Sequence, residues 1–217
     1  MLIELAGPAG VGKSTLTAEL AHRLNAGSET IWGLPVLPLL ENGVRLTTTL
    51  VDLWRHSRSP LWDEARHMVR LRTLLRALQQ RQAGGDQVVI FDEGPVFAMA
   101  WLRGFGHESM RSPQSADWWE RTLRDWSAVM DAIVVLDAPD LLLAQRIRNR
   151  PHEHEVKEFP DPEISRWMAR FREALDWVLA GLTRQGGPLV VRLSTAQPVE
   201  QIAEQLSHAL NGSRRAR

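Results

Sequence analysis

Two patterns of apolar and polar positions alternate along the chain. Short continuous apolar runs predict buried strands at Leu2–Ala6, Gln87–Phe91, Ala132–Leu136 and Leu189–Leu193, with a weaker strand at Thr30–Trp32. Apolar residues recurring every three or four positions predict helices at Ser14–Leu24, Leu61–Gln82, Ala116–Met130, Pro139–Arg148, Ile164–Thr183 and Val199–Leu210. Continuous apolar strands between helices are typical of a parallel sheet covered on both faces. The chain is therefore predicted to be an α/β protein, a three-layer sandwich of about five parallel strands.

Three stretches do not follow these periods. Prolines and glycines interrupt Gly33–Pro60, where only Thr47–Trp54 has the spacing of a short helix. Asn149–Pro162 is polar and charged and predicts a loop, and residues 212–217 predict a disordered tail. We expect a single domain over residues 1–211, because neither a repeat nor a low-complexity linker divides the chain.

Composition narrows the classes of function. The 217 residues include 26 Lys and Arg against 26 Asp and Glu, so the net charge is zero. A balanced charge argues against a protein that binds nucleic acid or a membrane surface through bulk positive charge. The absence of cysteine excludes disulfides, thiol catalysis and cysteine-ligated metal sites. No apolar run spans a bilayer and the first residues lack the pattern of a signal peptide, so we expect a cytoplasmic protein.

The strongest motif is a phosphate-binding loop. It fits the pattern G-x-x-x-x-G-K-[ST] at every fixed position, and it lies between a predicted strand and a predicted helix. Its glycines let backbone N–H groups curl around an anion, to which the helix N-terminus adds partial positive charge. Lys13 is placed to reach the β- and γ-phosphates of ATP, and the Ser14 hydroxyl to coordinate Mg²⁺. The candidate nucleotide-binding residues are Gly7, Pro8, Ala9, Gly10, Val11, Gly12, Lys13, Ser14 and Thr15.

Two carboxylates, Asp92 and Glu93, follow the apolar run Val88–Phe91. Ligands of open α/β sheets lie at the carboxyl ends of the strands, so both are candidate catalytic residues. Asp92 could hold Mg²⁺ through water or accept a proton from an attacking hydroxyl. Glu93 could take the second role if Asp92 takes the first, and the sequence does not decide which of them is the base.

Arg146 and Arg150 are four residues apart and therefore share one face at the end of a helix. Paired arginines suit a transferring phosphoryl group, whose charge spreads over its oxygens. We expect a short lid over residues 146–162 that brings both side chains to ATP. The alternative is an exposed helix in an arginine-biased chain, since Lys13 and Lys157 are the only lysines.

The phosphoryl acceptor is expected between the third strand, the Leu61–Gln82 helix and the segment Gly33–Pro60. Arginines that could bind an anionic acceptor are Arg55, Arg58, Arg70, Arg72 and Arg103, and tryptophans that could stack on a planar ring are Trp54, Trp62, Trp101, Trp118 and Trp119. For each arginine the alternative is a solvated helix face, and for each tryptophan it is packing. His152-Glu153-His154 lacks a third ligand nearby, so we expect no metal site there.

Gly7–Ser14, Val88–Gly94 and Ile133–Arg150 together resemble the P-loop nucleoside and nucleotide kinases, above all thymidylate and deoxynucleoside kinases. The order of elements agrees over nearly the whole chain. The resemblance implies a P-loop NTPase fold with the first of five parallel strands in the middle, Lys13 at the transferred phosphate, Ser14 and Asp92 at Mg²⁺, and Arg146 and Arg150 in the lid. These families usually carry an arginine after the acidic residue of the third strand, where this chain has Glu93.

These features predict a kinase that uses ATP and Mg²⁺ to phosphorylate a small hydroxyl or phosphate acceptor, first of all a nucleoside or nucleoside monophosphate. Two alternatives stay open: a P-loop ATPase in which Glu93 activates water, and a kinase of a non-nucleotide compound such as an antibiotic. A GTPase is excluded, because neither lysine belongs to an N-K-x-D motif. The expected partners are ATP and the acceptor, with no nucleic acid and no membrane, and a homodimer is compatible with the sequence.

Overall fold

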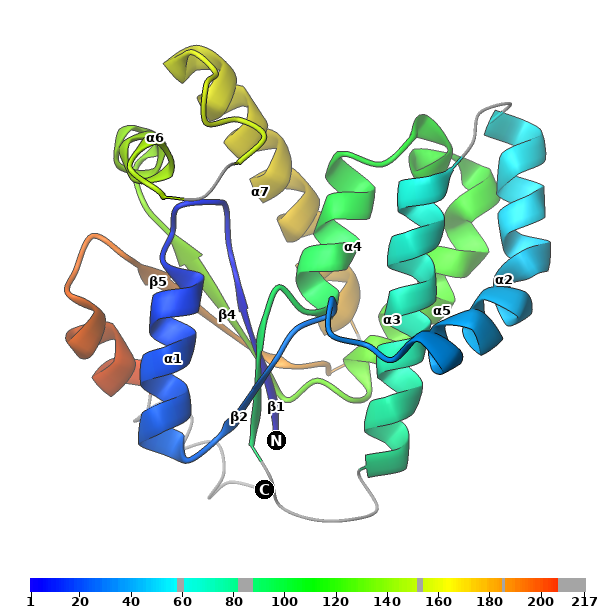
Figure 1. Cartoon of the computed structure of the whole chain (residues 1–217), viewed down its shortest axis with the longest axis horizontal. Helices are drawn as coiled ribbons and strands as arrows, with labels where there is room; N and C mark the ends of the chain where they lie inside the picture. Colours follow the sequence, from blue (N-terminus) through cyan, green and yellow to red (C-terminus); the bar gives the residue numbers. More distant parts are fainter. Residues whose placement is uncertain (58–60, 82–87, 152–153, 185, 207–217) are drawn as a thin grey trace.

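Five parallel strands form one sheet, and helices cover both of its faces (Figure 1). The structure is a computed structural model, and it describes residues 1–57, 61–81, 88–151, 154–184 and 186–206. Its elements in chain order are β1 Leu2–Ala6, α1 Lys13–Leu24, β2 Gly27–Glu29, α2 Val36–Ser57, α3 Trp62–Arg81, β3 Val89–Asp92, α4 Pro95–Gly104, the 3₁₀ helices η2 Glu108–Arg111 and η3 Pro113–Ser115, α5 Ala116–Ser127, β4 Ala132–Asp137, α6 Asp140–Arg148, α7 Asp161–Thr183 and β5 Leu189–Ser194. Residues 199–206 form a last helix.

The order of the strands is β2-β3-β1-β4-β5, which confirms the predicted sheet with the first strand in the middle. Leu5 on β1 lies opposite Asp92 on β3, and Ala6 lies opposite Val135 on β4. The carboxyl ends of these three strands therefore meet at one edge of the sheet. The phosphate loop follows β1 at this edge, so the fold itself brings the loop and Asp92 together.

The sheet separates two hydrophobic cores, because successive side chains of a strand point to opposite faces. Ile3 and Leu5 of β1 pack on one face, in the core that includes α1 and α6. Leu2 and Ala6 belong to the other core, which includes α3, α4 and α5. Figure 1 shows α1 and these three helices on opposite sides of the strands. The side chains of β1 are apolar on both faces of the sheet, except for the residue between Ile3 and Leu5.

That residue, Glu4, is a fully buried glutamate in the central strand. Its Oε1 accepts hydrogen bonds from the backbone N–H groups of Gly94 (3.2 Å) and Phe97 (2.8 Å), and its Oε2 accepts one from Val96 (2.7 Å). These donors belong to the first turn of α4, where N–H groups have no partner within the helix. Glu4 thus caps α4 from the neighbouring strand, and it fixes the turn that carries Asp92.

The weaker strand predicted at Thr30–Trp32 is wrong, because the strand lies at Gly27–Glu29 instead. β2 is an edge strand of only three residues, so it needs no continuous apolar run. Ile31 follows the strand and is fully buried, and its N–H donates to the carbonyl oxygen of Glu93 (3.1 Å). The apolar signal therefore came from packing beyond the end of the strand.

Two helices differ from the sequence prediction: α2 is longer than predicted, and α4 was not predicted. α2 covers 22 residues, far more than the short helix predicted at Thr47–Trp54. Pro38 does not interrupt it, because a proline in the first turn removes an N–H that has no helical acceptor. α4, Pro95–Gly104, was not predicted, since most of its residues are buried and it lacks the polar face that reveals an amphipathic helix.

The remaining predicted helices and strands are present with shifted ends, and α5 ends at Ser127, before the predicted Met130. The predicted ends at Gln82 and Leu210, the strand residue Gln87 and the tail 212–217 lie outside the described residues. Among the helices that the structure describes, none has the length and apolar character needed to cross a membrane.

An arginine of α7 holds the carboxyl end of β4. Arg172 donates from Nε and Nη2 to the carboxylate of Asp137 (3.0 and 2.9 Å) and from Nη1 to Asp140 (2.7 Å). A planar guanidinium is suited to such double recognition. The contact joins β4, α6 and α7, and it keeps α6 at the edge of the sheet where the phosphate loop lies.

The cap at Glu4 predicts a pH dependence of stability. Burial raises the pKa of Glu4 from its ordinary 4.5 to about 8, while the backbone hydrogen bonds and the charge of Lys13 lower it by less. The folded chain thus keeps a proton that the unfolded chain releases, and this contribution to stability is complete below about pH 4.5 and lost as the pH rises to about 8. Relative to Glu4→Gln, the free energy of unfolding of the wild type should fall over this range, by up to about 1.4 kcal/mol per pH unit.

Urea unfolding at a series of pH values measures this difference. Glu120→Gln, the same substitution at an exposed position of α5, is the control. A constant difference between the wild type and Glu4→Gln from pH 5 to pH 8 would show that Glu4 does not hold the proton.

Candidate active site

The predicted phosphate loop leaves β1 at Gly7 and enters α1 at Lys13. A Cβ at Gly7 would lie 2.2 Å from the carbonyl oxygen of Leu136, and Gly12, the N-cap of α1, has a φ of 90°. Both positions require glycine, the first for space and the second for its left-handed conformation. Pro8, Ala9, Gly10 and Val11 are buried, while Ser14 and Thr15 are exposed in the first turn of α1. The loop and the free N–H groups of this turn form an anion site.

Lys13 is buried inside this loop. Its Nζ donates hydrogen bonds to the carbonyl oxygens of Gly7 (2.9 Å) and Pro8 (3.1 Å), and neither of these acceptors carries a charge. Burial lowers the pKa of Lys13 to about 8, although the charges of Asp92 and Glu93 raise it. A buried ammonium with uncharged acceptors is stabilised by an anion, so the loop is prepared for a phosphate.

Asp92 ends β3 beside the loop. Its Oδ1 is buried, and among the described residues it has no hydrogen-bond partner. A buried carboxylate oxygen without a partner carries a desolvation cost that a bound cation removes. The exposed hydroxyl of Ser14 supplies a second oxygen ligand of the kind that Mg²⁺ prefers. These two side chains therefore fit a magnesium ion, which they would hold through Oδ1 of Asp92 and the hydroxyl of Ser14.

Glu93 follows in a strained backbone conformation, with a φ of 58°. A left-handed conformation costs a side-chain-bearing residue about 1–2 kcal/mol, and neighbouring contacts offset this cost. Trp32 donates from its indole Nε1 to Oε2 of Glu93 (2.8 Å), and Ile31 donates its N–H to the Glu93 carbonyl. One carboxylate oxygen of Glu93 is thereby oriented, whereas Oδ1 of Asp92 is not.

The conformation of this turn also depends on Gly94. A Cβ there would lie 2.6 Å from Cβ of Phe91 and 2.8 Å from Oε2 of Glu4. The kinase families that the chain resembles carry an arginine after the acidic residue of the third strand. An arginine at position 94 would displace the Glu4 side chain and with it the cap of α4. Glu4 could have been singled out from the sequence, since it is the single charged residue within the apolar run Leu2–Ala6. Its hydrogen-bond partners at the start of α4 could not have been predicted from that run.

Two arginines of α3 lie against Trp32. The guanidinium carbons of Arg66 and Arg70 are each 5.0 Å from the centre of the indole ring. The Nε of Arg70 is buried and has no hydrogen-bond partner in the described part of the chain. Burial lowers the pKa of Arg70, and the charge of Arg66 lowers it further. The two guanidinium groups are adjacent, and one of them has a buried N–H without an acceptor among the described residues. Such a pair favours the binding of an anionic group.

His67 joins Trp32 to α4. Its ring meets Trp32 edge-on, at 5.3 Å between centroids, and stacks on Trp101 at 4.3 Å with 7° between the planes. Burial lowers the pKa of His67, so the ring is neutral near pH 7, and its Nδ1 lies 2.7 Å from the carbonyl oxygen of Asp63, where an N–H would donate. Trp32, Arg66 and His67 were not singled out from the sequence. The spacing of Arg66 and Arg70, four residues apart on a helix, was the available signal.

A cavity of about 680 Å³ opens beside the two carboxylates, where the sequence placed the acceptor. Its lining comes from β3, α3 and the beginning of α2, and includes Asp92, Glu93, Leu34, Pro38, Thr73 and Ala77. A second cavity, of about 340 Å³, lies at the phosphate loop and is lined by Gly10, Gly12, Thr15, Arg146, Arg150 and Thr195. The two cavities are separate: the first borders the two carboxylates, and the second borders the phosphate loop.

The four predicted residues Lys13, Asp92, Glu93 and Arg150 are close enough for the last three to affect the pKa of the first. Arg146 is not among the charges that act on Lys13, but it lines the smaller cavity together with Arg150. It donates from Nη1 to the hydroxyl of Thr195 (3.2 Å) and from Nη2 to the Thr195 carbonyl (2.9 Å). These bonds hold Arg146 to the segment after β5. The segment between α6 and α7 is held at Arg150, whose carbonyl accepts a bond from Nζ of Lys157 (2.9 Å).

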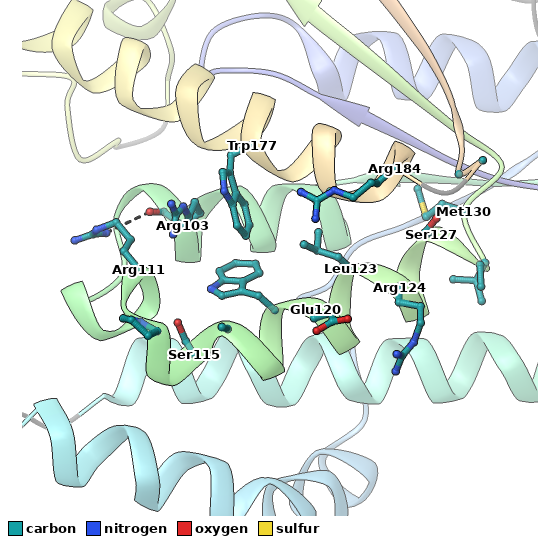
Figure 2. A pocket seen from close by; sticks show the side chains of 18 of the residues that line it. Arg103, Arg111, Ser115, Glu120, Leu123, Arg124, Ser127, Met130, Trp177 and Arg184 are labelled. Carbon is teal, nitrogen blue, oxygen red and sulfur yellow. Dashed lines mark hydrogen bonds between the residues drawn. The ribbon is translucent and has the colours of Figure 1, made fainter.

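A third cavity, of about 1080 Å³, lies elsewhere, between α5, α7 and the end of α4. Figure 2 shows Arg103 and Arg111 at one end of it and Arg124 and Arg184 at the other. The guanidinium of Arg103 covers the ring of Trp177 at 4.3 Å. Met130 and Asp131 in its wall precede β4, so this cavity is at the amino ends of the strands and contains no part of the phosphate loop. We do not place the chemistry there.

The other residues considered for the acceptor are dispersed. Arg55, Trp54 and Trp62 are exposed, Arg72 lies near Arg45 and Arg76, Trp118 and Trp119 are buried in the core, and Arg58 lies outside the described residues. His154 meets Trp167 edge-on, while His152 and Glu153 lie outside the described residues. Within the described ranges, no three acidic or histidine side chains form a metal cluster. Of the predicted set, Arg70 lies against Trp32, the partner of Glu93, and Trp101 is connected to Trp32 through His67.

Comparisons with known proteins agree with this geometry. A family model described as an AAA domain matches residues 3–166. No curated protein sequence gives a significant match. Similar solved structures include deoxyadenosine kinase from M. mycoides with bound dATP, with 15% identity, a TM-score of 0.57 and coverage of 97% of this chain and 100% of that chain.

Two further structures share the fold over similar lengths. Shikimate kinase from Bacteroides thetaiotaomicron has 16% identity and a TM-score of 0.51, covering 97% of this chain and 98% of that one. The YorR protein from Bacillus subtilis, in complex with phosphorylated GDP, has 16% identity and a TM-score of 0.54, covering 97% and 96%. The chain belongs to the AAA-domain family, and it has the fold of the P-loop small-molecule kinases.

Proposed function

We propose that this protein is a kinase that transfers the γ-phosphoryl group of ATP, with Mg²⁺, to a nucleoside or nucleoside monophosphate. One observation supports this most directly. The buried ammonium of Lys13 lies at a helix N-terminus that can bind phosphate, beside Oδ1 of Asp92, which has no hydrogen-bond partner among the described residues. Phosphoryl transfer needs little more from a protein than such positioning and charge neutralisation.

In this proposal the phosphate chain occupies the loop Gly7–Thr15. Lys13 exchanges its bonds to loop carbonyls for bonds to the β- and γ-phosphates. Arg150 and the segment between α6 and α7 close over the nucleotide as the lid, while Arg146 and Thr195 form the wall of the cavity beside the loop. Water excluded by this closure would otherwise compete with the acceptor.

Ser14 and Asp92 are assigned to Mg²⁺. The ion supplies neutralisation of the charge on the phosphate oxygens when it is bound. This assignment leaves Glu93 to accept the proton of the attacking hydroxyl or phosphate oxygen, in the orientation that Trp32 fixes. The acceptor oxygen forms a bond to the γ-phosphorus as the bond to the β-phosphate oxygen breaks, so ADP leaves and Glu93 holds the proton.

The acceptor belongs in the cavity of about 680 Å³ beside Asp92 and Glu93. Arg66 and Arg70 do not line this cavity, but they lie against Trp32, the partner of Glu93, and in this proposal they attract an anionic group of the acceptor, such as a 5′-phosphate. Similar structures include deoxyadenosine kinase and a protein in complex with phosphorylated GDP, which supports a nucleoside or nucleotide. The likeness to shikimate kinase keeps a hydroxylated carboxylic acid as the alternative.

Release of ADP with and without acceptor tests the reaction. The protein is incubated with ATP and Mg²⁺ and a panel of nucleosides, nucleoside monophosphates, hydroxy acids and antibiotic alcohols. We expect ADP release that depends on a nucleoside or nucleoside monophosphate, and Lys13→Ala should reduce turnover at least about 100-fold, because charge stabilisation of the transition state is lost. Equal release with and without every acceptor would identify an ATPase instead, and a response confined to non-nucleotides would change the acceptor class.

The contribution of Arg70 is tested separately. Arg70→Ala should raise KM for a phosphorylated acceptor about 10-fold or more, with little change in KM for ATP, because one charge-assisted contact to the acceptor is removed. Arg72→Ala is the matched control, since it also removes an arginine of α3 whose Nε is buried, but one that lies near Arg45 and Arg76. If both variants behave alike, Arg70 acts on the packing of α3 and not on the acceptor.

A further inference from the structure

The cavity of about 1080 Å³ takes no part in the proposed phosphoryl transfer. Its lining includes Arg103 of α4, Trp119 and Leu123 of α5 and Trp177 of α7, and it is named the α5–α7 cavity. It is as large as the bigger small-molecule sites, which span roughly 300–1,000 Å³. Its described lining contains no residue of the phosphate loop or of the turn after β3. A ligand in it would therefore occupy a place separate from the nucleotide and the acceptor.

Positive side chains lie at both ends of the α5–α7 cavity. Figure 2 shows two arginines at each end, Arg103 and Arg111 at one and Arg124 and Arg184 at the other. The acidic residues of the described lining are Glu120 and Asp131, and Oδ2 of Asp131 accepts a hydrogen bond from the backbone N–H of Leu2 (2.8 Å). Four arginines against two acidic residues leave a positive excess in a chain whose net charge is zero.

The two arginines at the first end act on each other. Burial lowers the pKa of Arg103, the charge of Arg111 lowers it further, and the charge of Glu173 raises it by less. Arg111 donates from Nη1 to the carbonyl oxygens of Arg103 (3.2 Å) and Gly106 (2.9 Å), which carry no net charge. In the described part of the chain, neither guanidinium forms a salt bridge. An anion at this end would relieve the repulsion between them.

The arginines at the second end are exposed. Arg184 is the C-cap of α7, and its guanidinium forms no salt bridge with any described residue. The Nε of Arg124 lies 3.7 Å from Oδ1 of Asp125, and both side chains are exposed, so water weakens this pair. The second end therefore also has positive charge that a ligand can use.

Between the two ends the wall is apolar and aromatic. Figure 2 shows Trp177 and Leu123 between the two pairs of arginines. Trp177 is half-buried, and the ring of Trp119 meets it edge-on, at 5.0 Å between centroids and 77° between the planes. A Cβ at Gly181 would lie 2.7 Å from Cδ1 of Leu123, so α5 and α7 are closely packed and this wall is formed before any ligand binds. A planar ring packs well on such a wall.

The serine hydroxyls of the described lining already donate hydrogen bonds within the chain. Ser112 donates to the carbonyl oxygen of Ser109 (2.7 Å), Ser115 to that of Ser112 (2.9 Å) and Ser127 to that of Leu182 (2.7 Å). Each hydroxyl has a single O–H, so none is left to donate to a ligand. The donors that the cavity offers are therefore chiefly guanidinium groups, which favour an anion over a neutral sugar.

We propose that the α5–α7 cavity is a second ligand site, and that it takes a planar aromatic compound with a negatively charged group at each end. The ring packs on Trp177 and Leu123 in the middle of the cavity, and the negative groups meet the two pairs of arginines. The site does not depend on the proposed function, because none of these residues takes part in the phosphoryl transfer.

Isothermal titration calorimetry of the full chain with naphthalene-2,6-disulfonate tests the site. We expect one disulfonate to bind per chain, with a Kd at least about 10-fold lower than that of naphthalene-2-sulfonate, which can pair with the arginines of one end only. Arg184→Ala should raise the Kd of the disulfonate about 10-fold, because it removes one of the cations at the second end. Arg166→Ala is the matched control, since it removes another exposed arginine of α7 that is not part of the lining, and its Kd should equal that of the wild type.

A variant of the phosphate loop separates the two sites. Lys13→Ala should bind the disulfonate as the wild type does, because Lys13 does not line the α5–α7 cavity. Circular dichroism and thermal melting show whether each variant is folded. A chain that does not bind the disulfonate, or that binds both sulfonates with equal affinity, would overturn the proposal. So would binding that Arg184→Ala leaves unchanged, or binding that Lys13→Ala abolishes in a folded chain.

Discussion

The contact between Glu4 and the first turn of α4 is the constraint on which the rest of the site depends. A carboxyl group buried in the middle of a parallel sheet needs hydrogen bonds from the protein, and three backbone N–H groups at the start of α4 donate them to the oxygens of Glu4. It attaches α4 to β1, the strand that leads into the phosphate loop. α4 carries Trp101, which stacks on His67, and His67 meets Trp32, the partner of Glu93. One hydrogen-bonded cap therefore connects the strand before the phosphate loop with the aromatic residues around Glu93.

The same contact limits the sequence of the turn after β3. Gly94 must remain glycine because the carboxylate of Glu4 fills the space of a side chain. Glu93 consequently adopts its strained conformation next to a residue that cannot relieve the strain. The strained backbone of Glu93, the buried ammonium of Lys13 and the buried Oδ1 of Asp92, which has no hydrogen-bond partner among the described residues, lie together, as such features do where a protein gives up stability for chemistry. Around them, the two cores are apolar and supply the rigidity that this arrangement requires.

The sequence predicted what local patterns encode. The strand, loop and helix around Gly7–Ser14 are specified by eight consecutive residues, and the buried strands by their own apolar runs. The position of Asp92 followed from the register of parallel strands. The partner of Glu4, the contact between Trp32 and Glu93 and the pair Arg66 and Arg70 join residues that are far apart along the chain, so no local period contains them.

The errors also have physical causes. α4 is buried on nearly all sides and lacks an amphipathic pattern, and the proline in the first turn of α2 suggested a break where a helix begins.

The scarcity of lysine has a chemical consequence. Besides the terminal amine, the chain offers only two primary amines, and Nζ of Lys157 is bonded to the carbonyl of Arg150. The other, Lys13, lies in the phosphate loop with a pKa lowered to about 8, so a substantial part of it is the nucleophilic free base in mildly alkaline solution. An adenosine analogue that carries an acylating or sulfonylating group would therefore modify this chain almost at a single lysine. The loop could be labelled covalently without engineering, and its occupancy read by mass spectrometry.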